Sequence, residues 1–272
     1  MPKTKNKTLL RIEKLEVVYH HVSTAVQGVS LEVNKNQIVA LLGVNGAGKT
    51  TTLRAISGFL GVDDAKVTEG VIELSGEKIQ NRAPHLITKK GVVLVPERDK
   101  VFENLTVAEN LEVCVPPGGG KADRKALMDQ IFHYFPVLAK IKTRLGGYLS
   151  GGERQMLAIA TALLCKPKLL LIDELSLGLA PLIVEELLSL IKVIRDEQQV
   201  TVLLVEQNAM AALEVSEYGY IMENGRIVFD GDPQRLKDHQ DIQEFYLGQG
   251  DRQIRRSYRD IKQYHRSRRW YG

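Results

Sequence analysis

This sequence has little cysteine, no long apolar run and no pattern of a secretion signal. Its 272 residues include two cysteines, Cys114 and Cys165, which are too few for a disulfide framework or a cysteine-rich zinc site. No stretch approaches the roughly 18 to 20 apolar residues that cross a bilayer. The basic start, residues 1–7, leads into an alternating, charged segment and not into the apolar core of a signal peptide. These absences predict a soluble, cytoplasmic chain with reduced thiols, which reaches a membrane only through a partner.

The net charge of +4 is unevenly distributed along the chain. Residues 251–272 contain eight Lys or Arg and two Asp, interleaved with Tyr and Trp, whereas the first 250 residues contain 29 basic and 31 acidic side chains. We therefore predict one domain over residues 8–248 and a basic tail over residues 249–272. Such a tail suits an anionic partner such as nucleic acid or lipid headgroups, or it packs on its own domain.

Hydrophobic periodicity predicts an α/β fold with a sheet covered on both faces. Short apolar runs typical of buried parallel strands alternate with amphipathic segments typical of helices. Alternation at residues 9–19 and 24–33 predicts half-exposed strands of an antiparallel N-terminal sheet. Residues 99–165 have mostly helical patterns, which indicates a helical insertion. The predicted buried strands cover residues 38–42, 92–95, 169–172 and 200–205.

A glycine-rich loop separates the first buried strand from a predicted helix at residues 49–57. The loop matches the pattern G-x-x-x-x-G-K-[ST] of P-loop nucleotide-binding proteins, and its strand–loop–helix setting disfavours a turn that binds nothing. Its glycines let backbone N–H groups approach phosphate oxygens, and the helix N-terminus adds partial positive charge. In such loops the lysine stabilises the phosphates and the following threonine is a Mg²⁺ ligand. The candidate residues for ATP and Mg²⁺ are Gly43, Asn45, Gly46, Ala47, Gly48, Lys49, Thr50 and Thr51.

Two carboxylates follow the apolar run at residues 169–172. Asp173 and Glu174 fall at the C-terminal end of a predicted central strand, where ligands bind in open α/β sheets. An exposed turn with two solvated carboxylates is the better reading of this pair alone, but the upstream phosphate loop reverses that preference. We expect Asp173 to hold Mg²⁺ and Glu174 to orient or deprotonate the attacking water.

A second glycine motif precedes the predicted helix at residues 153–164. Ser150 can cap this helix, and Gly151 and Gly152 leave its N-terminus open to a phosphate. An ordinary capped helix start explains Ser-Gly-Gly equally well. The longer segment, however, is Leu149-Ser150-Gly151-Gly152-Glu153-Arg154-Gln155.

That segment matches in full the signature of ABC proteins, and with the phosphate loop and the acidic pair the chain resembles the ATP-binding subunit of an ABC transporter over residues 8–248. The resemblance implies a RecA-like P-loop core with an antiparallel β subdomain and a helical insertion. It also implies that the signature contacts ATP held by an opposite subunit, in a nucleotide-sandwich dimer with a second copy or a similar ATPase. Tyr19 lies where the family places an aromatic that stacks on adenine, although a plain strand residue is as good a reading.

Three positions depart from the common family pattern, and one of them is Leu175, which follows Glu174 where proline is common. Glu97 stands where the family usually has glutamine, and its carboxylate can still bind Mg²⁺. Gln207 stands in place of the switch histidine, and no histidine lies between residues 134 and 238. Gln207 can hydrogen-bond a phosphate as a sensor but carries no charge.

With its segments Pro96-Glu97-Arg98, Val205-Glu206-Gln207-Asn208 and Ser176-Leu177-Gly178-Leu179-Ala180-Pro181, the chain resembles one of the two ATPase subunits of branched-chain amino acid importers. The resemblance implies a peripheral ATPase at the cytoplasmic face of the cell membrane, which energises uptake through two membrane-spanning permease subunits. A second ATPase and an external solute-binding protein complete such systems. A non-transport ABC ATPase acting on nucleic acid or ribosomes is the alternative, but those proteins resemble tandem cassettes or carry long coiled-coil insertions, so a nucleic-acid partner is not expected. An exporter ATPase also stays open, and nothing in an ATPase subunit specifies the transported substrate.

Overall fold

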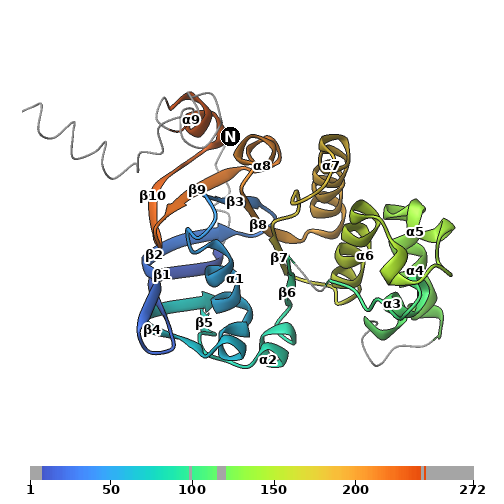
Figure 1. The fold of residues 1–272 in the computed structure, drawn as a ribbon, viewed down its shortest axis with the longest axis horizontal. Helices are drawn as coiled ribbons and strands as arrows, with labels where there is room; N and C mark the ends of the chain where they lie inside the picture. Colours follow the sequence, from blue (N-terminus) through green and yellow to red (C-terminus); the bar gives the residue numbers. More distant parts are fainter. Residues whose placement is uncertain (1–7, 98–99, 115–120, 240–241, 243–272) are drawn as a thin grey trace, which may run out of the picture.

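Two β-sheets and the helices packed on them make up the molecule (Figure 1). The computed structural model describes residues 8–97, 100–114, 121–239 and 242. The predicted basic tail at residues 249–272 therefore lies outside the described residues. No helix in the described ranges is both long and apolar enough to pass through a bilayer.

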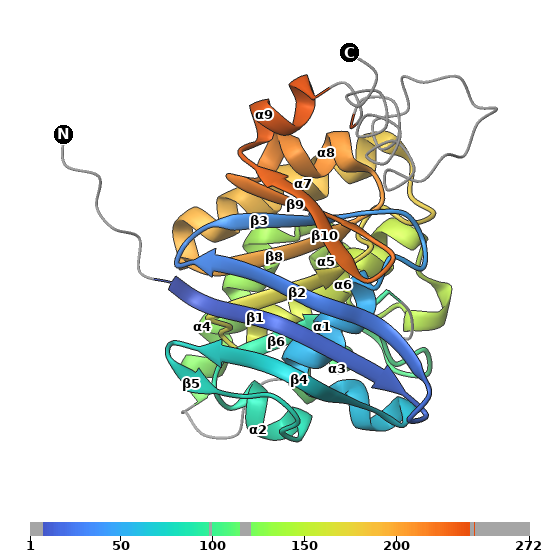
Figure 2. The same cartoon turned by 90° about the vertical axis from the view of Figure 1, so that its left-hand side faces the viewer.

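The first sheet is antiparallel and four-stranded, and its strands run side by side in Figure 2. Its long strands alternate buried apolar and exposed polar residues, as expected for a sheet with one face on the core. Its order is β2 (Ser23–Asn34), β1 (Thr8–Tyr19), β4 (Ala65–Leu74) and β5 (Glu77–Lys78).

The second sheet has six strands, of which five run parallel and the edge strand β10 is antiparallel. Every residue of its central strands is buried, because helices or the other sheet cover both faces. Its order is β10 (Arg226–Gly231), β9 (Tyr218–Glu223), β3 (Ile38–Leu42), β8 (Thr201–Glu206), β7 (Leu169–Asp173) and β6 (Val92–Val95).

Helices α3, α4 and α5 lie at the end of the molecule opposite the antiparallel sheet, and α6 lies beside them (Figure 1). Short 3₁₀ turns cover Phe59–Asp63 and Gly146–Tyr148. The α-helices are α1 (Lys49–Ser57), α2 (Pro84–Thr88), α3 (Val107–Cys114), α4 (Lys121–Tyr134), α5 (Pro136–Lys140), α6 (Gly151–Leu164), α7 (Pro181–Gln198), α8 (Ala209–Val215) and α9 (Pro233–Asp238).

The core consists of two apolar clusters, one on each face of the parallel sheet. Alternate residues of β3 illustrate the division: Ile38 and Leu42 join the cluster with α6, α7 and α8, whereas Val39 and Leu41 join the cluster with α1 and the antiparallel sheet. This is the period-2 geometry of a strand buried on both sides. The parallel strands therefore end at one common edge, where the loops after them meet.

The expected fold class, an α/β core with an antiparallel β subdomain, is confirmed. One detail differs from the sequence reading: Asp173 is the last residue of β7 and does not follow it. The free thiols of Cys114, at the end of α3, and Cys165, directly after α6, are half-buried.

Candidate nucleotide site

The loop between β3 and α1 has a backbone that only glycine tolerates at key points. Gly46 and Gly48 have φ of 80° and 104°. A Cβ on Gly48 would lie 2.7 Å from the Met222 Cε atom and 2.9 Å from the Ala25 carbonyl oxygen. Gly48 is also the N-cap of α1 and makes no side-chain cap hydrogen bond. The first N–H groups of α1 are therefore left without a side-chain cap, as in helix N-termini that bind phosphate.

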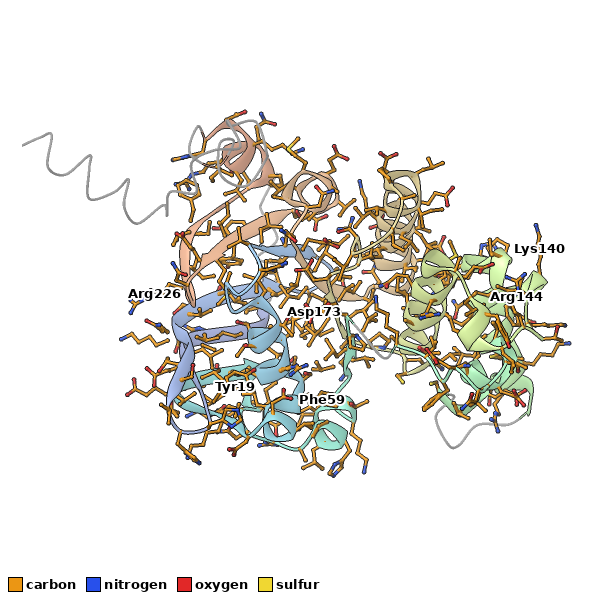
Figure 3. The ribbon with its side chains drawn as sticks, in the orientation of Figure 1. Tyr19, Phe59, Lys140, Arg144, Asp173 and Arg226 are labelled. Atoms are coloured by element: carbon orange, nitrogen blue, oxygen red, sulfur yellow. The ribbon has the colours of Figure 1, made fainter. Side chains whose placement is uncertain are left out.

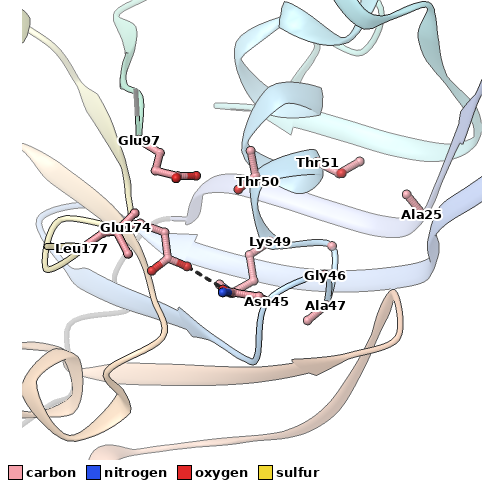
Figure 4. Close-up of a pocket in the computed structure, with 11 residues that line it drawn as sticks. Ala25, Asn45, Gly46, Ala47, Lys49, Thr50, Thr51, Glu97, Glu174 and Leu177 are labelled. Carbon is pink, nitrogen blue, oxygen red and sulfur yellow. Dashed lines mark ion pairs between the residues drawn. The ribbon is translucent and has the colours of Figure 1, made fainter. Parts of the chain in front are cut away.

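A cavity of about 350 Å³ opens over this loop (Figure 4). It brings residues 45–51 together with Glu97 and Glu174, which come from the ends of two neighbouring parallel strands. Ala25 of β2 and Leu177 also line it, and no sequence pattern had marked Ala25. The complete lining is Ala25, Asn45, Gly46, Ala47, Gly48, Lys49, Thr50, Thr51, Glu97, Glu174 and Leu177.

Lys49 is almost completely buried, with 5% of its surface exposed. Its Nζ donates hydrogen bonds to the carbonyl oxygens of Gly43 at 2.9 Å and Val44 at 3.2 Å, and it pairs with Glu174 Oε1 at 3.0 Å (Figure 4). Three oxygen partners satisfy the ammonium group. An anion entering the cavity would compete with the Glu174 carboxylate for this cation.

Thr50 and Asp173 place two oxygen donors side by side. The Thr50 hydroxyl donates to Asp173 Oδ1 at 3.1 Å. The pKa of Asp173 is raised to about 6, chiefly by burial. The charges of Glu174 and Glu97 add to this rise, whereas the Thr50 hydrogen bond and the charge of Lys49 oppose it. The charged form of Asp173 therefore lacks a full counter-charge in this site.

This donor set fits Mg²⁺ bound together with phosphate. Mg²⁺ prefers oxygen ligands and in phosphate sites uses one or two carboxylates plus phosphate oxygens. Within the described ranges, no group of three or more His, Cys, Asp or Glu side chains could hold a metal by itself. Thr50, Asp173 and Glu97 would supply some of the oxygen ligands of the ion, and phosphate oxygens and water would supply the others.

Glu206 is a buried carboxylate behind the site that the sequence reading missed. It is 1% exposed and ends β8, next to β7. Its oxygens accept hydrogen bonds from the Ser176 N–H at 2.9 Å and the Ser176 hydroxyl at 2.5 Å. Burial raises its pKa to about 7 against these hydrogen bonds. An acidic residue ending the apolar run at residues 200–205 was the available signal.

The second glycine motif lies away from this cavity. Ser150 caps α6 in a reciprocal capping box: its N–H donates to Glu153 Oε2 at 2.8 Å, and its Oγ accepts from the Glu153 N–H at 3.2 Å. A Cβ on Gly151 would lie 3.0 Å from Leu179 Cδ2, just before α7, and a Cβ on Gly152 would lie 2.9 Å from Ile183 Cγ2, within α7. Ser150 and Gly151 are exposed, and none of the three residues lines the cavity of its own chain.

Comparison with known proteins decides the family. A family model described as ABC transporter matches residues 26–176, more than half of the chain. The chain belongs to the ABC transporter family. This ABC protein is 41% identical over 243 residues to the high-affinity branched-chain amino acid transport ATP-binding protein BraG of Pseudomonas aeruginosa, covering 88% of this chain and 100% of the relative.

Two further similarities agree with this assignment. The probable branched-chain amino acid transport ATP-binding protein LivF of Archaeoglobus fulgidus is 38% identical over 240 residues, which cover 88% of this chain and 99% of the relative. The solved ADP conformation of MJ1267, an ATP-binding cassette of an ABC transporter, matches with a TM-score of 0.74 at 27% identity, covering 89% of this chain and 99% of that chain. The ABC protein described here thus binds and hydrolyses ATP.

Tyr19 and Gln207 occupy peripheral positions in this ABC ATPase. The Tyr19 hydroxyl lies 3.2 Å from Oγ1 of Thr51, in the first turn of α1, although Tyr19 does not line the cavity. Gln207 directly follows β8 and is exposed. Stacking on adenine by Tyr19 and phosphate sensing by Gln207 stay predictions.

Proposed function

We propose that this chain is the ATP-hydrolysing subunit of an importer that energises uptake of branched-chain amino acids or related small solutes through separate membrane subunits. The observation that carries the proposal is the cavity in which the start of α1, Lys49 and Glu174 converge, in a chain that is similar to BraG and LivF over 88% of its length. The related proteins support the solute class, and the cavity supports the chemistry.

The residues of the cavity have distinct roles in this proposal. The N–H groups at the start of α1 and the Lys49 ammonium stabilise phosphate charge. Thr50, Asp173 and Glu97 hold Mg²⁺, which when bound neutralises charge on the phosphate oxygens. Because Lys49 pairs with Glu174 at 3.0 Å, a phosphate that takes over the ammonium releases the Glu174 carboxylate. Glu174 then orients and deprotonates the attacking water.

A second ATPase subunit completes the site in this proposal. Ser150, Gly151 and Gly152 form the N-terminus of α6, where Ser150 is the N-cap. None of them lines the cavity over the phosphate loop of their own chain. Such a helix N-terminus suits phosphate, so we assign it to ATP held by the opposite subunit. That subunit is a second copy or a similar ATPase, and two permease subunits and an external solute-binding protein complete the system at the cytoplasmic face of the membrane.

Affinity purification from gently solubilised native membranes, with partners identified by mass spectrometry, tests this function. We expect two multi-spanning proteins and a second ATPase to co-purify with the tagged chain, and the accompanying binding protein then identifies the solute. A Lys49→Ala chain serves as the control for assembly that does not depend on nucleotide. Recovery of ribosomes or nucleic acid without membrane proteins would refute the transport role, and recovery of an export machinery would refute the direction.

A further inference from the structure

The segment after β7 is fixed to the end of β8 at two neighbouring points. The Glu174 N–H donates to the Val205 carbonyl oxygen at 3.0 Å. Two residues further on, the N–H and the hydroxyl of Ser176 donate to the two carboxylate oxygens of Glu206, at 2.9 and 2.5 Å. The segment starts after Asp173, which ends β7 near the middle of the molecule (Figure 3). These hydrogen bonds leave it little freedom to move relative to the sheet.

Glu174, at the start of this segment, has an unfavourable backbone conformation. Its φ is 50°, in the left-handed region that residues with a Cβ rarely adopt. Such a conformation persists only where the surrounding structure determines it. Here the conformation accompanies a Glu174 side chain that lines the nucleotide cavity and pairs with Lys49 at 3.0 Å. The bonds to β8 therefore hold the backbone from which the Glu174 carboxylate reaches the cavity.

Glu206 contributes to this arrangement from outside the cavity. It is 1% exposed, and neither Glu206 nor Ser176 lines the cavity. Ser176 lies between Glu174 and Leu177, which both do. A buried carboxylate is unfavourable unless it is hydrogen-bonded, and both oxygens of Glu206 accept from this one residue of the segment. The two acceptors thus fix the backbone and the side chain of Ser176 together.

We propose that Glu206 is a positioning residue for ATP hydrolysis: by accepting from both the N–H and the hydroxyl of Ser176, it holds the segment in the conformation that directs the Glu174 carboxylate into the cavity. Without these acceptors the Glu174 backbone can leave the left-handed region, and its carboxylate moves away from the attacking water. ATP binding is retained, because Lys49 and the start of α1 bind the phosphates. The inference rests on the proposed role of Glu174 as general base.

Glu206→Met tests this role, because methionine is of similar length and its thioether is only a weak acceptor. We expect kcat to fall by roughly ten- to a hundredfold, the order expected when a reacting group is misplaced by about 1 Å, while the ATP dissociation constant stays at its wild-type value. Phosphate release is measured on the full chain in the assembly purified from membranes, and ATP affinity by equilibrium titration. E206Q keeps an acceptor oxygen for the Ser176 N–H, so it should restore most of the wild-type kcat.

The double variant E174Q/E206M shows whether Glu206 acts through Glu174. If it does, the E206M change leaves no base to misplace, and the double variant should hydrolyse ATP at the residual rate of E174Q. Losses that multiply in the double variant would overturn the inference. So would a wild-type kcat in E206M, or a kcat as low in E206Q as in E206M.

Glu217→Met is the matched control. The Glu217 carboxylate accepts from the Ile38 N–H at 2.6 Å and from Arg195 at 2.5 Å. This contact lies at the start of β3, hence at the opposite end of the parallel strands from the cavity, and its loss should leave kcat unchanged. Should E206M fail to fold, Ser176→Ala removes the hydroxyl bond alone and should lower kcat by a smaller factor, which disappears in the E174Q background.

The E174Q variant by itself separates this inference from the proposed function. If E174Q turns over as the wild type does, the assignment of the base fails and the inference falls with it. If E174Q is slow and E206M is as fast as the wild type, the base assignment stands and the positioning role of Glu206 alone is refuted.

Discussion

At the scale of single residues, the site depends on charges that are buried next to each other. Lys49 and Glu174 neutralise one another at 3.0 Å, whereas Asp173 and Glu206 are held by hydrogen bonds from Thr50 and Ser176. Burial costs a charged group far more than its pairing returns unless every partner is present. The side chains around Asp173 and Glu206 therefore do not balance these two buried charges in full, and a cation or a proton would stabilise them.

Glu174→Gln tests the proposed general base. The substitution keeps shape and hydrogen bonding but removes the ability to accept a proton. We expect turnover to fall by at least about a hundredfold, the usual contribution of a general base, while ATP binding persists. Steady-state phosphate release and equilibrium ATP binding measure the two quantities. Turnover close to that of the wild type would refute the assignment.

The raised pKa of Glu206 predicts that the stability of the fold decreases as the pH rises. Because burial raises its pKa from 4.5 to about 7, the folded chain binds a proton that the unfolded chain has lost between these values. The free energy of unfolding should therefore fall by up to about 3 kcal/mol from pH 4.5 to pH 7 on account of this group.

Urea unfolding of wild type and Glu206→Gln across this pH range measures that contribution. The difference between the two proteins cancels the titration of groups they share. We expect a flatter pH profile for the variant and a relative gain in stability above pH 7. Parallel profiles would show that Glu206 titrates normally in the folded chain.

At the scale of elements, strands and helices were predictable where their patterns are local. Helix α1 begins at Lys49 and ends at Ser57 as predicted, since a strand, a glycine loop and an amphipathic run mark both ends. The hairpin at Asn224-Gly225 joins β9 and β10 as its turn chemistry requires. The sequence predicted that β7 ends at Ile172, one residue before its observed end at Asp173. A carboxylate normally follows a buried strand, whereas Asp173 is buried within this one.

Gly48→Ala should disrupt the phosphate loop itself. The added Cβ would meet Met222 Cε at 2.7 Å at a φ of 104°, so the loop or its neighbours must move. We expect loss of nucleotide binding, measured by equilibrium titration. Gly76→Ala is the matched control: its φ is 84° but its Cβ would meet nothing within 4 Å, so it should cost about 1 kcal/mol of stability and leave binding intact.

Ser150→Ala tests whether the α6 cap does more than stabilise a helix. Loss of the capping bond should cost about 1 kcal/mol, and a role at the opposite subunit's phosphate should reduce turnover in addition. Asp232→Ala removes the equivalent cap of α9, where Asp232 accepts from the Arg235 N–H at 3.0 Å. Equal turnover in both variants would confine Ser150 to a structural role.

At the scale of the whole molecule, the cavity and the second glycine motif lie at separate places on the chain's surface. The cavity gathers residues from the loop after β3 and from the ends of β6 and β7, while Ser150 lies exposed at the start of α6. In the proposed function, the second glycine motif contacts ATP held by an opposite subunit. Each active site would then be shared between two subunits, and turnover would require assembly with a second ATPase.

Deletion of residues 251–272 should separate catalysis from membrane association. All residues that line the cavity lie between residues 25 and 177, so basal ATPase activity should be unchanged. The tail carries eight basic residues and two acidic ones, and its loss should weaken binding to anionic membranes or permease subunits. Vesicle sedimentation with the shortened chain measures this, and unchanged sedimentation would refute the role.

The sequence by itself determined the family, the fold class and the phosphate loop, because these depend on contiguous residues whose spacing carries the chemistry. Only the tertiary structure decided that Lys49 pairs with Glu174, that Ala25 and Leu177 line the cavity, and that Glu206 ends the strand next to the one that carries Asp173. These residues come from segments far apart in the chain. Their proximity follows from parallel strands that end at one edge, and no local pattern in the sequence records it.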